Sequence, residues 1–173
     1  MNIKHALVGI VAVAFLIAAA PFLRGTAYAQ DLDKVHKSMD LLKSEAAKLG
    51  APKISGTDTV TGKTVPALYF GSTKIDNNYD LVDNVVKQMG GTATIFVKSG
   101  DDYVRISTNV PGPSGRATGT ILDPKGKVIV SINKNEAFYG EVDILGKPYV
   151  TGYEPIHDGS GAVIGIYYVG YMK

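Results

Sequence analysis

The last third of the chain, residues 138–173, constrains the fold most. It contains three strand-like runs joined by Gly-Lys-Pro and Asp-Gly-Ser-Gly turns. Short alternating runs with turns as tight as these form an antiparallel meander. Six tyrosines lie in this stretch, and a sheet face that carries phenols can pack apolar groups while it offers hydroxyls to a bound molecule. This part of the chain therefore predicts a sheet with a face suited to binding.

Residues 1–29 have the form of a secretory signal peptide. Lys4 precedes an apolar run from Ala6 to Ala20, and Ala27-Tyr28-Ala29 is a cleavage site of the A-x-A type. We expect cleavage to leave a single domain, residues 30–173, that is exported to the periplasm. The less favoured alternative is an uncleaved N-terminal helix that anchors the domain in the membrane. The leader carries two basic residues and no acid, so its removal lowers the formal net charge from +2 to zero.

Composition excludes several classes of function. A domain with balanced, scattered charge lacks the basic surface of a nucleic-acid-binding protein. The chain has no cysteine, which excludes disulfides, thiolate nucleophiles and covalently attached haem. Beyond the leader its histidines are His36 and His157, and no hydrolase or metalloprotease motif accompanies them. We therefore expect neither an enzyme nor a metal or cofactor site.

Residues 31–49 are predicted to form a helix, because apolar residues recur there at spacings of three and four. The apolar stripe has two interpretations. It packs on the sheet of its own domain, which is slightly favoured, or it forms a coiled-coil seam that joins two subunits into a homodimer. Residues 128–137 fit either a helix or a strand. The other predicted elements are a strand at 65–70, a helix at 78–89, strands at 93–98 and 102–110, and the C-terminal meander.

Arg105 is the strongest candidate for a ligand contact. The predicted domain has only two arginines, Arg105 and Arg116. Strand alternation puts Tyr103, Arg105 and Ser107 on one face, where a guanidinium beside a phenol and a hydroxyl would suit a carboxylate. The alternatives are a surface arginine or one that is paired with an acidic side chain. A second candidate set, for ligand contact or for core packing, shares one face of a later strand: Tyr149, Thr151 and Tyr153.

Six blocks of sequence carry a resemblance to a known family. In chain order they are GGTATIF (90–96), YVRISTNV (103–110), RATGT (116–120), FYGEV (138–142), ILGKPYVTGYEPI (144–156) and GIYYVG (165–170). Together they resemble the Cache 3/Cache 2 fusion type of single Cache sensor domain. That domain is the extracytoplasmic part of many bacterial chemoreceptors and histidine kinases.

The resemblance implies an α+β, PAS-like fold in which a long N-terminal helix packs on a five-stranded antiparallel sheet. It implies a helix at 128–137 and a pocket between the sheet and the loops, with small organic ligands that are often short carboxylates. By motif position, Arg105 would bind the carboxylate and Arg116 would be a weaker candidate on the covering loop. The implied neighbours of Arg105 are Tyr103, Tyr139 and Tyr149.

The C-terminus departs from the receptor pattern. Receptors of this type continue from the Tyr-Val-Gly block into a second transmembrane helix, whereas this sequence stops at Lys173. We therefore expect a free-standing periplasmic sensor that feeds chemotaxis or two-component signalling through a separate membrane receptor or histidine kinase. The alternative is an interaction module that binds no metabolite and docks on such a receptor.

Overall fold

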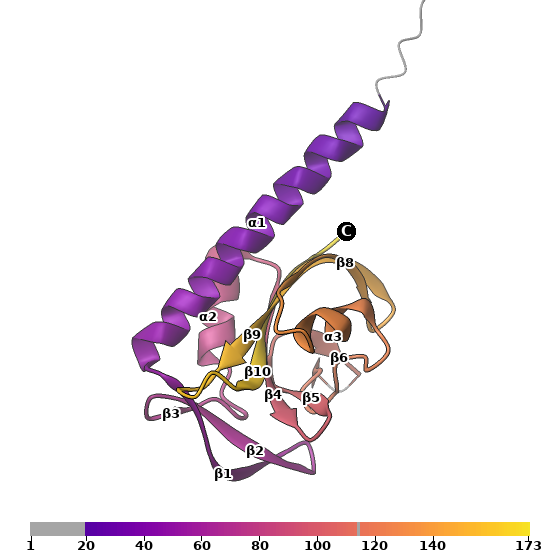
Figure 1. Ribbon diagram of the computed structural model, residues 1–173. Helices are drawn as coiled ribbons and strands as arrows, with labels where there is room; N and C mark the ends of the chain where they lie inside the picture. The colour runs from indigo at the N-terminus through magenta and orange to yellow at the C-terminus, as the bar shows by residue number, and fades with distance from the viewer. Residues whose placement is uncertain (1–19, 114) are drawn as a thin grey trace, which may run out of the picture.

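The computed structural model describes residues 20–113 and 115–173 (Figure 1). Helix α1 (Ala20–Leu49) leads into a small sheet of β1 (Pro52–Val60), β2 (Lys63–Phe70) and β3 (Thr73–Lys74), and then helix α2 (Asp80–Met89) follows. The central sheet consists of β4 (Thr92–Ser99), β5 (Asp102–Thr108), β8 (Phe138–Ile144), β9 (Lys147–His157) and β10 (Val163–Met172). The connection from β5 to β8 carries β6 (Pro111–Gly112), β7 (Gly115–Arg116) and helix α3 (Lys127–Ile132). The predicted α+β, PAS-like architecture is confirmed.

The five strands of the central sheet are antiparallel and lie in the order β5-β4-β10-β9-β8. The C-terminal meander is therefore formed as its turns predict, and its last strand, β10, pairs with β4. The turn between β8 and β9 has two residues, Leu145 and Gly146. The connection from β5 to β8, residues 109–137, is called the covering connection below. It runs along the free edge of β5, where Ile121 forms an isolated β-bridge with Val104.

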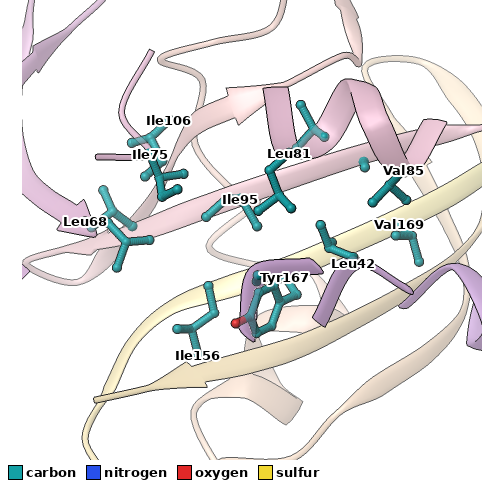
Figure 2. Close-up of a cluster of buried hydrophobic side chains, with 14 of the residues drawn as sticks. Leu42, Leu68, Ile75, Leu81, Val85, Ile95, Ile106, Ile156, Tyr167 and Val169 are labelled. Carbon is teal, nitrogen blue, oxygen red and sulfur yellow. The ribbon is translucent and has the colours of Figure 1, made fainter. Parts of the chain in front are cut away.

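The two faces of the central sheet are covered by different elements. Helices α1 and α2 pack on one face, and α3 packs on β8 and β9 at the other (Figure 1). The helix-side core includes the residues labelled in Figure 2, which are Leu42, Leu68, Ile75, Leu81, Val85, Ile95, Ile106, Ile156, Tyr167 and Val169. A second core lies on the face that α3 covers, and we call it the cavity-side core because a cavity lies over the same face. It consists of Phe96, Tyr103, Val110, Ala117, Leu122, Val128, Ile132, Ile144, Tyr149, Tyr153, Ile166 and Tyr168.

The apolar stripe of α1 packs on the sheet of its own domain. Val35, Met39 and Leu42 are fully buried, whereas Leu49, at the end of the stripe, is 38% exposed. This packing favours the first interpretation of the stripe, while a homodimer through α1 stays a prediction.

Helix α1 begins at Ala20 rather than at residue 31. Alanine-rich sequence continues the helix, and Pro21 lies in the first turn, where proline is tolerated. Residues 1–19 of the predicted signal peptide lie outside the described residues. Within residues 20–113 and 115–173, no helix combines the length and the hydrophobicity that crossing a bilayer requires.

Two regions differ from the sequence pattern. The sequence does not predict β1, because its residues are mostly polar. The structure leaves most of β1 exposed, and its pairing with β2 around a Thr61-Gly62 turn makes it a strand. Residues 128–137 divide into a helix that ends at Ile132 and a turn that leads to β8. The helix implied by the resemblance is therefore present but shorter than expected.

Candidate functional site

A cavity of about 580 Å³ lies over the second face of the central sheet. Its lining comes from β5, the segment before α3, the first turn of α3 and the β8–β9 hairpin. Leu122, Val128 and Ile144 contribute apolar walls, and Arg105 and Tyr153 contribute polar groups from the sheet. Concave sites with mostly apolar walls and a few placed polar groups are typical of small-molecule binding.

Arg105 is a buried cation without an acidic partner. Arg105 is only 5% exposed. None of the ion pairs among the described residues involves Arg105. Nη1 donates to Thr120 Oγ1 at 2.8 Å, and the guanidinium carbon lies 4.8 Å from the centre of the Phe96 ring. Nε is buried and has no hydrogen-bond partner in the described structure. Burial lowers the pKa of Arg105 from its ordinary value, and a buried charge of this kind is costly unless an opposite charge binds it.

The covering connection fixes Arg105 in place. The backbone N–H of Arg105 donates to Thr120 O at 2.9 Å, and the N–H of Gly119 donates to Arg105 O at 2.8 Å. The Thr120 hydroxyl donates to Ala117 O at 2.6 Å, which leaves its oxygen to accept from Arg105 Nη1. The loop and the arginine are therefore held together as one unit at the edge of the sheet.

Tyr153 lies beside Arg105 in the cavity lining. It is 1% exposed, and its ring packs 4.9 Å from that of Tyr168. Burial raises the pKa of Tyr153, and the charge of Arg105 opposes this rise. No described residue forms a hydrogen bond with its hydroxyl, in contrast to Tyr168, whose hydroxyl is bonded to Thr92 at 2.9 Å. A neutral phenol with a free O–H can donate to a bound anion.

Three further predicted residues share the face of the cavity without lining it. Tyr103 and Tyr149 are 3% and 5% exposed and belong to the cavity-side core. Thr151 is fully buried and donates to Gly140 O at 2.8 Å, so its hydroxyl is used to join β9 to β8. The shared face of Tyr149, Thr151 and Tyr153 agrees with strand alternation.

Tyr139 lies on the opposite face of the sheet. Its ring stacks on His36 of α1 with centroids 3.9 Å apart, and its hydroxyl donates to Glu154. Glu154 also pairs with Lys43 of α1. Burial opposes ionisation of Glu154, but the hydrogen bonds from Lys43 and Tyr139 outweigh burial and leave its pKa below the ordinary value. Tyr139 therefore contacts the helix side and not the cavity.

Arg116 is engaged away from the cavity. It binds the Asp83 carboxylate of α2 through two hydrogen bonds of 2.7 and 2.8 Å, and its guanidinium carbon lies 4.5 Å from the centre of the Tyr79 ring. This bidentate pair ties the covering connection to α2. The structure thus brings Arg105 and Tyr153 together and holds Arg116 elsewhere.

The expectation that Ser107 shares a face with Arg105 is wrong. The pairs Phe96↔Arg105 and Ile95↔Ser107 leave Ile106 as an extra residue in β5, which is a β-bulge. Beyond the bulge the alternation is reversed, so Ser107 lies on the helix side with Ile95 and donates to Asn78 O at 2.6 Å.

The sequence does not predict the apolar residues that line the cavity. Leu122, Val128 and Ile144 lie in three separate segments, and the first two belong to the long Gly- and Pro-rich connection whose path the sequence does not define. The Val128-Ile129-Val130 run was a signal of burial, but it does not reveal what it packs against.

A long helix on one face of a five-stranded antiparallel sheet, with a cavity on the other face, defines a PAS-like domain. The family model of the Cache 3/Cache 2 fusion domain matches residues 26–173, which is most of the chain. The protein belongs to this family. Cache domains are extracellular sensor modules for small ligands in chemotaxis and signalling, and are not enzymes. No curated protein sequence shows a significant match to the chain.

Proposed function

We propose that the protein is a periplasmic sensor that binds a small organic carboxylate over Arg105. The observation that supports this function is the buried guanidinium that lines the cavity with an unpartnered Nε and that takes part in none of the ion pairs of the described residues. A planar guanidinium presents a fork of donors that matches a carboxylate. A carboxylate in this position would also neutralise the buried charge, and Tyr153 could donate a further hydrogen bond to it.

The bound state is reported to chemotaxis or two-component signalling through a separate membrane receptor or histidine kinase. Family membership supports the sensory role. The alternative, an interaction module without a metabolite, would not need polar donors in the lining of a cavity, and Arg105 and Tyr153 both belong to the lining of this one.

The test is a ligand screen followed by titration of arginine variants. Carboxylates that bind only the folded protein raise its melting midpoint, so a thermal-shift screen of carboxylates and amino acids selects the probe. For that probe, Arg105→Lys keeps the charge but loses the fork of donors, and we expect the affinity to fall by roughly 1.5–3 kcal/mol. Arg105→Ala should weaken binding at least as much.

The matched control is Arg116→Lys, the same substitution at the arginine that binds Asp83 outside the cavity. It should leave the affinity unchanged in titration calorimetry. An Arg105→Ala variant that binds the probe as tightly as the parent protein refutes the proposed site.

A further inference from the structure

The size and the walls of the cavity exceed what a two-carbon acid needs. Pockets of roughly 300–1,000 Å³ hold ligands of drug-like size, and this cavity measures about 580 Å³. Besides Arg105 and Tyr153, its lining includes an inner apolar wall of Leu122, Val128 and Ile144, each of which is at least nine-tenths buried. A short acid on Arg105 would leave most of this volume unoccupied by ligand.

The mouth of the cavity carries two exposed apolar side chains among exposed charged ones, which are those of Asp123, Lys127, Glu141 and Asp143. Ile121 and Leu145 line it from the covering connection and from the β8–β9 turn, and they are 38% and 54% exposed. Exposed large hydrophobic side chains that line one depression are typical of a binding surface.

Leu145 has an unfavourable backbone conformation for its residue type. Its φ is +52° and that of Gly146 is +83°, which is the pattern of a two-residue type I′ turn, where asparagine or aspartate is preferred at the first position. A bulky residue with positive φ is an outlier, and such outliers gather at functional sites. The conformational cost at Leu145 points to a use for its side chain at the cavity mouth.

The charged side chains around the cavity already have partners. Asp123 accepts the N–H of Lys125 at 2.9 Å, and Asp143 accepts the N–H of Gly146 at 2.7 Å. Glu141 pairs with Lys173, and Lys127 Nζ lies 5.4 Å from the centre of the Phe138 ring. These contacts do not call for a second charge on the ligand.

We infer that the ligand is a monocarboxylate with an apolar body, either aromatic or a chain of roughly five to eight carbons. Its carboxylate binds Arg105, its body lies on the inner apolar wall, and its far end lies between Ile121 and Leu145. This inference rests on the proposed function and specifies the ligand class.

The first test is a series of affinities measured with the full chain by titration calorimetry. The probes are straight-chain monocarboxylates from acetate to octanoate, together with benzoate. Each added methylene should tighten binding by about fourfold until the cavity is filled. Hexanol, which lacks the carboxylate, and norleucine, which adds an ammonium group, should both bind more weakly than hexanoate. An affinity that does not change with chain length, or norleucine binding more tightly than hexanoate, overturns the inference.

The second test uses Leu145→Asn, which removes the apolar side chain and suits the turn. Its melting midpoint should equal or exceed that of the parent. Hexanoate affinity should fall roughly three- to tenfold, the scale of one partly buried apolar side chain, while acetate affinity stays the same. The control is Ile54→Asn, an equally apolar exposed position on β1 outside the cavity lining, which should change neither affinity.

The two proposals fail in different ways. If acetate and hexanoate bind equally well and both depend on Arg105, the apolar body is refuted and the carboxylate sensor stands. If no carboxylate of any length binds, or if binding is independent of Arg105, both proposals fall. If Leu145→Asn loses acetate affinity and hexanoate affinity equally, the proposed contact between Leu145 and the apolar body of the ligand is also refuted.

Discussion

Replacement of Asp76 by asparagine should change how stability depends on pH. Asp76 follows β3 and is 2% exposed. Its Oδ2 accepts the N–H of Leu68 at 2.8 Å, whereas Oδ1 is buried without a partner in the described structure. Burial raises the pKa of Asp76 from 3.8 to about 6; the backbone hydrogen bond from Leu68 and the charge of Lys74 oppose this rise, and the charge of Asp58 adds to it.

The sign of the effect follows from linkage. Below pH 3.8 the carboxyl is protonated in both states and has no effect. As the pH rises from 3.8 to about 6, the unfolded chain ionises first, so the folded state loses stability, and the loss is complete above pH 6. The two pKa values differ by about 2.2, and each pKa unit corresponds to about 1.4 kcal/mol, so the total loss is about 3 kcal/mol.

Urea denaturation of the parent and of Asp76→Asn at pH values from 4 to 7 measures this effect. The chain has no tryptophan, so far-UV circular dichroism is the suitable signal. The variant cannot ionise at this position, and other groups cancel in the comparison. At pH 4 the unfolded chain is already partly ionised at this position, so part of the loss lies below the range. Relative to the parent, the free energy of unfolding of Asp76→Asn should therefore rise by roughly 2–2.5 kcal/mol between pH 4 and pH 7.

Asp58→Asn is a control whose own pH dependence lies outside this range. The hydrogen bond from Lys74 lowers the pKa of Asp58, so ionised Asp58 stabilises the fold at neutral pH. This contribution is lost only as the pH falls below about 3.8, so the difference between the parent and Asp58→Asn should stay nearly constant from pH 4 to pH 7. A difference between parent and Asp76→Asn that is constant across the range, or that shrinks as the pH rises, would refute the argument that Asp76 is held in a site that favours its neutral form.

Two further predictions concern Arg105 and α1. Arg105→Met should leave the ligand-free protein within about 1 kcal/mol of the parent in urea denaturation, because the lost contacts are offset by removal of the unpartnered buried Nε; a loss of 3–5 kcal/mol, the scale of a broken buried ion pair, would contradict this. Leu42→Ala, at a fully buried position of α1, should destabilise by about 2–5 kcal/mol. Leu49→Ala, where the side chain is 38% exposed, should stay within about 0.5 kcal/mol, and equal losses in the two variants would contradict the packing of the stripe.

The features that the sequence predicted are those that depend on local chemistry. The meander follows from its turns, and the shared face of Tyr149 and Tyr153 follows from alternation along one uninterrupted strand. The buried stripe of α1 follows from helical spacing. In each case the deciding residues are close together in the chain, so the pattern can be read without knowledge of the partner elements.

The features that the sequence did not predict depend on register and on long connections. One extra residue in β5, Ile106, moves Ser107 to the other face, and nothing in the alternation of Tyr103 to Asn109 reveals the bulge. Tyr139 lies on the helix side because its register places it opposite Gly152, a pairing that the sequence of β8 alone does not define. The rarity of arginine, the strand pattern and the family motif all identified Arg105 as a candidate, but its lack of an ion pair is a property of the folded chain.

The central sheet is a single backbone layer, and β9 faces a different environment with each successive residue. Tyr153 lines the cavity on one side; the next residue, Glu154, is held on the other side by Lys43 of α1 and by Tyr139, which stacks on His36 of the same helix. Only one peptide unit separates these two positions. A shift of β9 at Tyr153 therefore also shifts Glu154, which holds α1 through Lys43. Movement can pass from the cavity to the helix along the backbone of β9 itself, with no intervening chain of side-chain contacts.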